Sequence, residues 1–338
     1  MRPLNSILGS ALMVMMLATA GWSASQAGYV TMNFDLSAQK AGEEVKLWIP
    51  YPVSDTDQLI TDIKVSGDYT ASAVYTDPVH GNPILFARWD KDAKSRTLTL
   101  AFHASRKEVR RDKFPAKEGC FERADFQEYL KATRLGPITG EVKKLADEIT
   151  KNKKTVQAKA RAIYDWACRN MYRDPETIGC GLGDVNALLK KPGGKCTDIS
   201  SVYIALARAA GVPAREIFGL RLGKKPGEDI TTYQHCWAEF FLPGYGWVPV
   251  DPADVRKAML VENLKLEDPK TQEYQKYFWG GIDPYRIKLA TGRDVVLNPP
   301  QSGEPLNTFG YPYAQVGTAT VNFYDPKTFK YQFTWKGQ

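Results

Sequence analysis

A cysteine at position 196 is placed where it could act as a nucleophile. Cys196 follows Gly193 and Gly194, and an apolar helical stretch over 202–210 comes soon after it. We therefore expect Cys196 at the start of a helix, where unpaired backbone amides and the positive end of the helix dipole stabilise a thiolate. A buried structural cysteine or half of a disulfide is the ordinary alternative. Catalysis would require partners for this thiol.

Two later residues, His235 and Asp251, have the types that such a thiol needs. Predicted strands at 235–242 and 247–250 are separated by turn residues, which indicates a hairpin. With a five-residue loop, Asp251 lies diagonal to His235 on one face, at roughly 7–8 Å between backbones. A carboxylate there fixes the imidazole tautomer while the other ring nitrogen faces the thiol. A satisfied histidine and a turn-forming aspartate before Pro252 are the alternatives.

Four blocks around these residues resemble the core of the bacterial transglutaminase-like superfamily. They are Gly-Gly-Lys-Cys-Thr-Asp-Ile-Ser at 193–200, Ala-Leu-Ala-Arg-Ala-Ala-Gly-Val-Pro-Ala-Arg at 205–215, His-Cys-Trp-Ala-Glu at 235–239 and Gly-Trp-Val-Pro-Val-Asp-Pro at 246–252. The resemblance implies a papain-like core in which Cys196 is the nucleophile and His235 is the general acid/base. It assigns Asp251 as the orienting carboxylate.

An acyl-transfer site also needs hydrogen-bond donors for the oxyanion of the intermediate. The backbone amide of Cys196 would be one such donor, since it lies at a helix start. For the side-chain donor the sequence offers three candidates, Asn170, Tyr172 and Lys195. Trp237 fits an aromatic position of the superfamily and could form a wall of the site, although core packing is equally expected for a tryptophan on a hairpin strand.

The elements around these residues predict an α+β protein. The resemblance implies that the cysteine-bearing helix of its papain-like core packs on an antiparallel sheet. Short alternating runs between Tyr29 and His103 indicate a β-sandwich-like domain before that core, and the apolar period becomes helical further along. The predicted units are a signal peptide at 1–27, a β domain at 28–110, the catalytic core at 111–260 and a β-rich extension at 261–338.

The first 27 residues predict a secretory signal peptide. Arg2 precedes an apolar stretch over 7–20, and a small-x-small site ends at Ala27. The apolar stretch is shorter than the roughly 20 residues that cross a bilayer as a helix, and a retained membrane anchor is the alternative. We therefore expect an exported protein, periplasmic or extracellular, without stable membrane insertion after cleavage.

The cysteines give an odd count. The five are Cys120, Cys168, Cys180, Cys196 and Cys236, so at least one thiol has no partner within the chain. Cys168 and Cys180 are close enough in sequence for a local disulfide in an oxidising compartment. The absence of a Cys-x-x-Cys motif and the presence of only three histidines argue against a redox motif and a metal site.

Composition and motifs together define the predicted function. The net charge of +7 is spread along the chain, which argues against a nucleic-acid partner. We expect an enzyme that attacks peptide or glutamine-type amides through a thioester, without a cofactor, with hydrolysis favoured over transamidation by analogy with bacterial relatives. Its partner would be a protein or peptide substrate, such as one of the cell envelope. The alternative is a non-catalytic envelope-binding or assembly module on the same scaffold.

Overall fold

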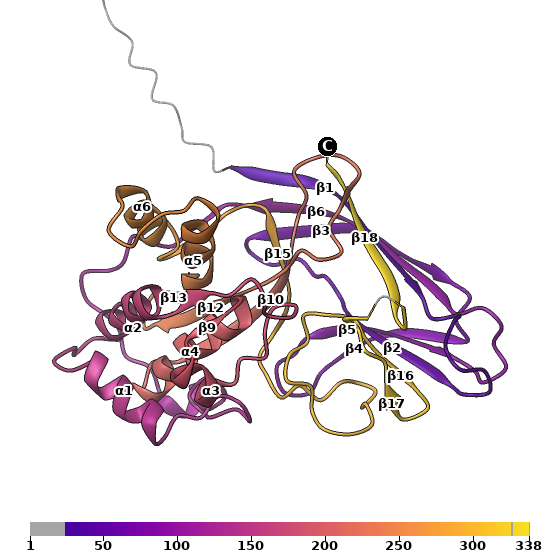
Figure 1. The fold of residues 1–338 in the computed structure, drawn as a ribbon, viewed down its shortest axis with the longest axis horizontal. Helices are drawn as coiled ribbons and strands as arrows, with labels where there is room; N and C mark the ends of the chain where they lie inside the picture. The colour runs from indigo at the N-terminus through magenta and orange to yellow at the C-terminus, as the bar shows by residue number, and fades with distance from the viewer. Residues whose placement is uncertain (1–23, 326, 338) are drawn as a thin grey trace, which may run out of the picture.

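The computed structural model describes residues 24–325 and 327–337. In it a β-sandwich lies beside a mixed layer of helices and sheet, which confirms the predicted α+β class (Figure 1). The predicted signal peptide at 1–27 falls outside the described residues except for its last few. None of the helices in the described part of the chain has the length and apolar character of a bilayer-spanning segment.

The sandwich consists of two five-stranded sheets. Its core forms because inner-face residues alternate with outer-face residues along each strand. On β1 and β6, Val30 lies opposite Phe102 and Met32 opposite Leu100, all four buried. Truncating Phe102 to alanine would cost roughly 3–5 kcal/mol. In sheet order the strands are β11 (Glu228–Asp229), β18 (Lys330–Gly337), β1 (Ser25–Asp35), β6 (Thr97–Lys107) and β3 (Gln58–Gly67), then β17 (Ala319–Thr320), β16 (Tyr313–Val316), β2 (Val45–Pro50), β5 (Pro83–Trp89) and β4 (Ala71–Thr76).

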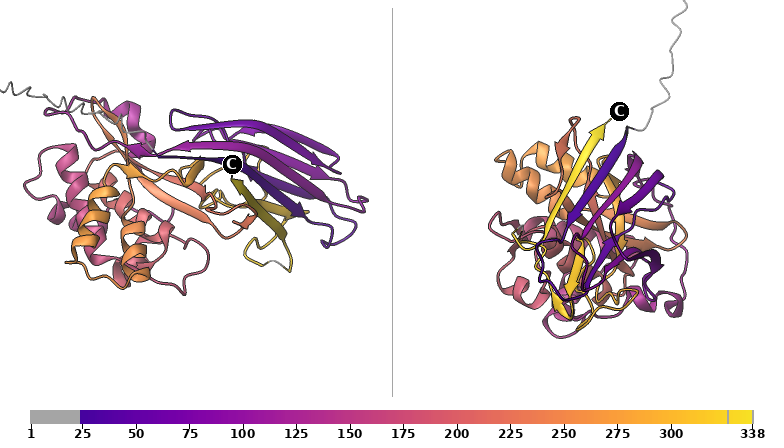
Figure 2. Two further views of the ribbon diagram at one scale, coloured as in Figure 1. Left: turned by 90° about the horizontal axis from the view of Figure 1, so that it is seen from above. Right: turned by 90° about the vertical axis from the view of Figure 1, so that its right-hand side faces the viewer.

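The C-terminal strands complete both sheets of the sandwich. Strand β18 pairs with β1 from the Gly28–Gly337 position onward, and β16 pairs with β2. Figure 2 shows β18, in yellow, beside the indigo β1. The sequence left open whether the residues after Asp254 form a lid, a third domain or part of the core. The structure divides them among helices at 252–261 and 269–277, the neighbouring sheet and the sandwich.

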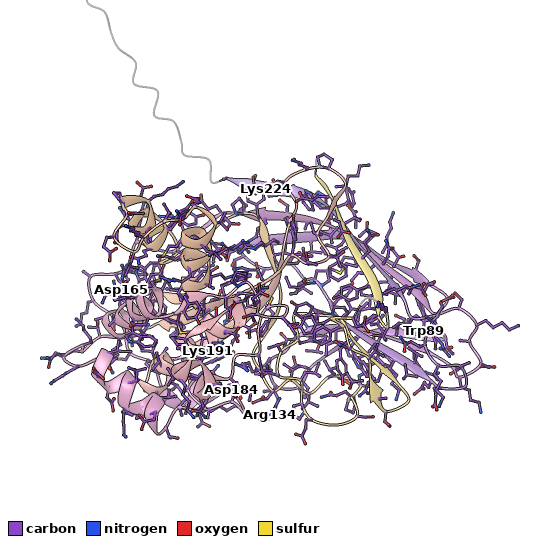
Figure 3. All side chains as sticks on the ribbon, viewed as in Figure 1. Trp89, Arg134, Asp165, Asp184, Lys191 and Lys224 are labelled. Atoms are coloured by element: carbon purple, nitrogen blue, oxygen red, sulfur yellow. The ribbon has the colours of Figure 1, made fainter. Side chains whose placement is uncertain are left out.

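The second layer contains a four-stranded antiparallel sheet covered by helices. Its strand order is β13-β12-β10-β15, so β15 joins the sheet from well beyond the hairpin. Asp184 starts one short helix by accepting a hydrogen bond from the amide of Ala187, and Figure 3 shows it on the helical side, opposite Trp89 of the sandwich. The elements are β10 (Ala214–Arg221), β12 (Gln234–Leu242), β13 (Gly246–Val250), β15 (Arg286–Thr291), α1 (Glu141–Ile149), α2 (Val156–Asn170), α3 (Val185–Lys190), α4 (Cys196–Ala209), α5 (Pro252–Val261) and α6 (Pro269–Tyr277).

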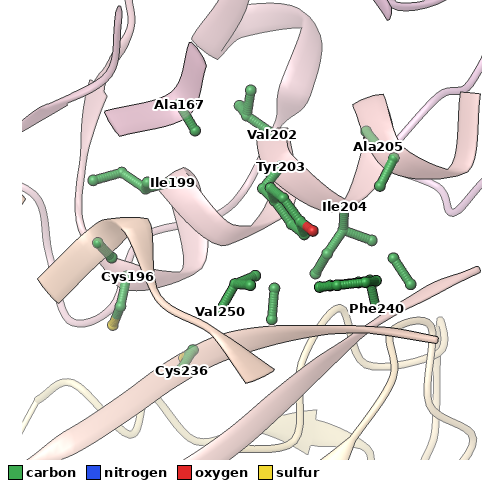
Figure 4. Close-up of a cluster of buried hydrophobic side chains, with 14 of the residues drawn as sticks. Ala167, Cys196, Ile199, Val202, Tyr203, Ile204, Ala205, Cys236, Phe240 and Val250 are labelled. Carbon is green, nitrogen blue, oxygen red and sulfur yellow. The ribbon is translucent and has the colours of Figure 1, made fainter. Parts of the chain in front are cut away.

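Helix α4 is the centre of this layer. It is buried on nearly every side, as expected of a helix whose apolar residues, chiefly alanine and isoleucine, are spread around it. Helices α1, α2 and α3 pack on α4 from one side, while β10 and β12 lie on the other. Figure 4 shows Ile199, Tyr203 and Ile204 of α4 near Phe240 and Val250 of the sheet. This packing holds the first turn of α4 rigidly above the edge of β12.

Short elements connect the two layers. Lys288 on β15 exchanges two hydrogen bonds with Gln58 on β3, at 2.8 and 3.0 Å, and so joins the sandwich to the four-stranded sheet. The remaining elements are the 3-10 helix η1 (Arg123–Tyr129), the antiparallel pair β7 (Val109–Arg110) and β14 (Gly281–Ile282), and the parallel pair β8 (Tyr172–Arg173) and β9 (Gly193–Gly194).

Candidate active site

The first turn of α4 positions Cys196. Asp198 accepts hydrogen bonds from the amides of Lys195 at 2.9 Å and Gly183 at 2.7 Å, which fixes the chain as it enters the helix. Gly194 is required here, since a Cβ at this position would lie 2.4 Å from the Asp198 side chain. The amide of Cys196 is among the first four of the helix, which have no intrahelical acceptor. The nucleophile candidate therefore lies beside a backbone donor.

The hairpin brings His235 and Asp251 together. Ala238 pairs with Val250, and extending that register by one residue places Asp251 diagonal to His235, as the sequence predicted. The Nε2 of His235 lies 2.7 Å from Oδ2 of Asp251, and both side chains are buried. The other oxygen of Asp251 accepts a hydrogen bond from the amide of Asp254 and begins α5. With Nε2 engaged, Nδ1 is the ring nitrogen left for the thiol.

A buried arginine, Arg286, supports this pair from β15. It contacts Asp251, and it pairs with Asp254 at 2.9 Å and Asp283 at 2.5 Å. Arg221 forms a further pair with Asp254 at 2.5 Å. Removing one partner of such a buried network typically costs about 3–5 kcal/mol, because a charge is left uncompensated. The network therefore holds Asp251 in place beside His235.

Three thiols meet next to the histidine. The sulfur atoms of Cys180, Cys196 and Cys236 all lie within 4.8 Å of one another, and Figure 4 shows Cys196 and Cys236 at the same edge of the helix–sheet interface. Tyr311 donates a hydrogen bond to Cys180 at 3.3 Å. All five cysteines are free. The local Cys168–Cys180 disulfide is not formed, because the loop after β8 carries Cys180 away from α2 to the start of α4.

These neighbours favour ionisation of Cys196. Hydrogen bonds from the Cys180 and Cys236 thiols hold the pKa of Cys196 well below its usual range against the opposing effect of burial, and His235 adds to the lowering. Burial and Arg221 lower the pKa of His235, but the carboxylates of Asp254 and Asp251 outweigh them and raise it. The arrangement thus favours a thiolate beside an imidazolium, which is the form a cysteine nucleophile requires.

A cavity of about 1130 Å³ opens onto Cys196 and His235. One wall is aromatic and comes from the C-terminal part of the chain, where the rings of Tyr311 and Phe323 stack with centroids 4.9 Å apart. The other wall, on β8 and α5, is cationic. The aromatic residues that line the cavity are Tyr233, Tyr285, Tyr311, Phe323, Tyr324, Phe329 and Tyr331. The site can therefore hold a substrate much larger than a single amide group.

The candidate oxyanion donors lie in different places. Lys195 lines the cavity next to Cys196. Tyr172 covers Gly193 with its ring and is partly exposed, outside the cavity lining. Asn170 is exposed and donates to the carbonyl of Trp166 at the end of α2. Of these three, Lys195 is the one that the structure places at the nucleophile.

Trp237 is outside the lining of the cavity, and its side chain points to the opposite face of β12 from that of Cys236. Its ring stacks on the imidazole of His235 with centroids 6.3 Å apart, and it packs against Gly219 of β10. The side chain is 1% exposed. Trp237 therefore supports the histidine from behind and does not form a wall of the cavity.

Sequence reasoning missed several residues that shape this site. Cys180 and Tyr311 come from irregular segments, and Arg286 comes from a strand far along the chain. The two glycines that flank Cys180 were a signal of a tight turn there. The spacing of Asp251 and Asp254, three residues apart at a helix start, was a signal of a shared carboxylate site.

Two groups of described residues have the spacing of metal ligands. The first is His235 with Asp251 and Asp254, but Arg286 and Arg221 already neutralise its carboxylates. The second is the trio of thiols, in which the pKa values of Cys180 and Cys236 are raised, Cys236 mainly by burial and Cys180 mainly by its contact with Cys196. Metal binding at either group would have to displace the thiol protons or the arginine partners.

Comparisons with known proteins agree with this geometry. Residues 143–252 match the family described as the transglutaminase-like superfamily. An uncharacterized protein of Haemophilus influenzae is 39% identical over 336 residues, covering 90% of both chains. A protein-glutamine gamma-glutamyltransferase of Pseudomonas aeruginosa is 32% identical over 85 residues, which are 24% of this chain and 12% of that protein.

A solved structure has a similar fold. A candidate cysteine protease from Cytophaga hutchinsonii superposes with a TM-score of 0.53 at 15% identity, over 93% of this chain and 99% of the other. At that level of identity the likeness concerns the fold alone. It extends over both the sandwich and the helical layer.

Proposed function

The chain belongs to the transglutaminase-like superfamily, and from that premise we propose that it is a cysteine-dependent acyl-transfer enzyme. Its substrate would be a peptide or glutamine-type amide, and the acyl group would pass through a thioester on Cys196. The observation that carries this proposal is the hydrogen-bonded pair of His235 and Asp251 beside a thiol whose pKa is lowered. Sequence order, superfamily membership and geometry all support the same three residues.

The proposed reaction uses groups already in place. The Cys196 thiolate attacks the amide carbonyl, and the backbone amide of Cys196 with Lys195 stabilises the oxyanion. Protonated His235 gives its proton to the leaving amine as the carbon–nitrogen bond breaks. Neutral His235 then takes a proton from water, and the resulting hydroxide attacks the thioester and releases the acid and the thiolate. Asp251 holds the imidazole in the required tautomer throughout.

Water is the acceptor we favour over a second amine. The cavity of about 1130 Å³ leaves room for water molecules beside a bound acyl group. An amine acceptor would instead give transamidation by the same chemistry. Incubation with a glutamine peptide, with and without a primary amine in excess, separates the two outcomes. Ammonia release that is matched by glutamate product in both cases supports hydrolysis, whereas amine-linked product as the main species overturns it.

Cysteine labelling tests the nucleophile without a known substrate. We expect iodoacetamide to alkylate Cys196 at pH values well below the ordinary thiol pKa of about 8.5, and His235→Ala to weaken that reaction. Cys168→Ala is the matched control, because Cys168 is a buried thiol outside the cavity. A Cys196 that stays inert in the folded protein would contradict the enzyme and favour a binding or assembly module.

We also propose that the protein is exported with cleavage near Ala27. The sequence of the first 27 residues supports this. Cleavage there would remove Ser25, Gln26 and Ala27 from β1, where they pair with β6, and would leave the pairing of β1 with β18 intact. Fractionation of the producing cell followed by intact mass measurement tests it. A mature chain starting near Gly28 in the exported fraction is expected, and a full-length chain retained in the cell overturns the proposal.

A further inference from the structure

Three cationic side chains converge on the cavity beside Cys196. They come from separate elements, Arg173 from β8, Lys195 from the residue before α4, and Lys257 from α5. The parallel pairing of β8 with β9 places Arg173 opposite Gly194, next to Lys195. Helix α5 contacts both β8 and α4. The fold therefore collects these charges at one wall of the cavity.

These three cations have no carboxylate partner within ion-pair distance among the described residues. The other charged groups that line the cavity have partners. Arg221 pairs with Asp254, Asp283 pairs with Arg286, and the ammonium of Lys224 lies over the ring of Tyr285. A third acid, Glu228, accepts hydrogen bonds from the amides of Lys224 and Lys225 and from the hydroxyl of Tyr233. The cationic wall is thus left with an excess of positive charge.

Burial makes that excess costly for the free protein. Lys257 is partly buried, and its burial lowers its pKa, as do the neighbouring charges of Arg221 and Arg173. Asp254 and the Cys196 thiolate act in the opposite direction. Like charges held together next to a nucleophile are relieved when an anionic ligand binds among them.

We propose that Arg173 and Lys257, with Lys195 adding positive charge beside them, bind a carboxylate of the acyl donor, so that the substrate is an acidic peptide with its carboxylate next to the reacting amide. The inference rests on the proposed function, since it concerns the same cavity. A guanidinium presents a planar pair of donors that matches a carboxylate, and two ammonium groups add charge from the other elements. The aromatic wall across the cavity fits the less polar part of such a peptide.

A matched pair of alkylating agents tests this inference independently of enzyme activity. Iodoacetate and iodoacetamide deliver groups of similar size to a thiolate, but iodoacetate carries the carboxylate. The measured quantity is the ratio of the iodoacetate rate to the iodoacetamide rate. We expect this ratio to be roughly tenfold higher for Cys196 than for free cysteine at low salt, and to decline as ionic strength rises. Equal preference in Cys196 and in free cysteine overturns the inference.

Variants localise the effect. Arg173→Gln and Lys257→Gln should each lower the iodoacetate preference about threefold or more, while the rate with iodoacetamide changes less. Lys225→Gln is the control, because Lys225 is exposed outside the cavity lining. If one variant fails to fold, the other and the salt dependence of the unaltered protein still decide. A Cys196 inert to both reagents contradicts the proposed function, whereas a reactive Cys196 without anion preference contradicts only the carboxylate site.

Peptide substrates distinguish the source of the carboxylate. The set consists of three glutamine peptides. The first has a neighbouring glutamate, the second has a neighbouring glutamine and a free C-terminus, and in the third both carboxylates are replaced by amides. We expect the amidated peptide to have a kcat/KM at least tenfold below one of the acidic peptides. Arg173→Gln should reduce that difference. Equal kcat/KM for all three peptides overturns the inference.

Discussion

Cys196 and Cys168 are two buried thiols in one hydrophobic core, but they lie at opposite ends of their helices. Cys196 is the first residue of α4, 3% exposed, and Cys168 lies in the last turn of α2, fully buried. The pKa of Cys196 is lowered by hydrogen bonds from Cys180 and Cys236. Burial instead raises the pKa of Cys168, although Tyr164 opposes this by a hydrogen bond. Burial alone therefore does not decide the state of a thiol, because the donors aimed at it can outweigh desolvation.

Helix direction strengthens the contrast. The start of a helix presents amide donors and partial positive charge, whereas its end presents carbonyl oxygens and partial negative charge. The backbone thus stabilises a thiolate at Cys196, whereas it would destabilise a thiolate at Cys168. The same residue type is the proposed nucleophile in one place and a small apolar side chain in the other.

Replacing each thiol by alanine should reveal the largest difference in activity between the two positions. Cys196→Ala should lower kcat/KM by roughly 10⁴-fold or more, since the nucleophile of such a triad acts as a unit with its base. Cys168→Ala should leave kcat/KM within about twofold. Steady-state assays on a cleavable amide check both, and similar losses in the two variants would show that the distinction is wrong.

Asp251→Asn should cause the next largest fall in kcat/KM. The amide cannot hold the imidazolium as the carboxylate does, so kcat/KM should fall by about 10³–10⁴-fold. Asp283→Asn is the matched control, because Asp283 also pairs with Arg286 but does not contact His235. Both variants should lose stability in thermal melts, and equal loss of activity in the two would assign Asp251 to folding only.

Cys180→Ala tests the donors directly. A hydrogen bond to a charged group contributes about 1.5–3 kcal/mol, so its loss should raise the pKa of Cys196 by roughly one to two units. In the unaltered protein the thiolate persists down to its lowered pKa and is lost only as pH falls through it. The imidazolium persists up to the raised pKa of His235 and is lost as pH rises through that value. Alkylation rates of Cys196 across pH should therefore shift to higher pH in Cys180→Ala, and an unmoved profile would remove Cys180 from the explanation.

The smallest expected effect is a change in the free energy of unfolding of Cys168→Ala. Cys168→Ala removes a buried sulfur atom and should lower the free energy of unfolding by about 1–2 kcal/mol. Denaturant unfolding of this variant beside Cys120→Ala, which alters an exposed thiol, measures the difference. No loss of stability in Cys168→Ala would mean that the core can collapse around the site.

Local sequence patterns were enough to predict the parts of the site that lie close together in the chain. The glycines before Cys196 indicated a helix start, and α4 begins at that residue. The hairpin pattern indicated the register that sets Asp251 beside His235, and the two side chains meet at 2.7 Å. Both depend on short-range rules of capping and strand pairing.

Contacts between distant segments could not be predicted in this way. Arg286 reaches Asp251 only because β15 joins the sheet at β10, and nothing in the local pattern specifies that pairing. Tyr311 reaches Cys180 through an irregular segment. Trp237 was predicted on the face of His235, but the packing of its ring against His235 and Gly219 was needed to show that it lies outside the cavity lining.

The last strand of the chain has a consequence for the timing of synthesis. Phe329 and Tyr331 line the cavity, and β18 must pair with β1 at the opposite end of the chain before that wall exists. A nascent chain that has emerged only as far as α5 thus contains Cys196, His235 and Asp251 without the aromatic side of their cavity. Synthesis of β18 is therefore a checkpoint, and a product that stops short of this strand would carry the proposed nucleophile without the surface proposed to select its substrate.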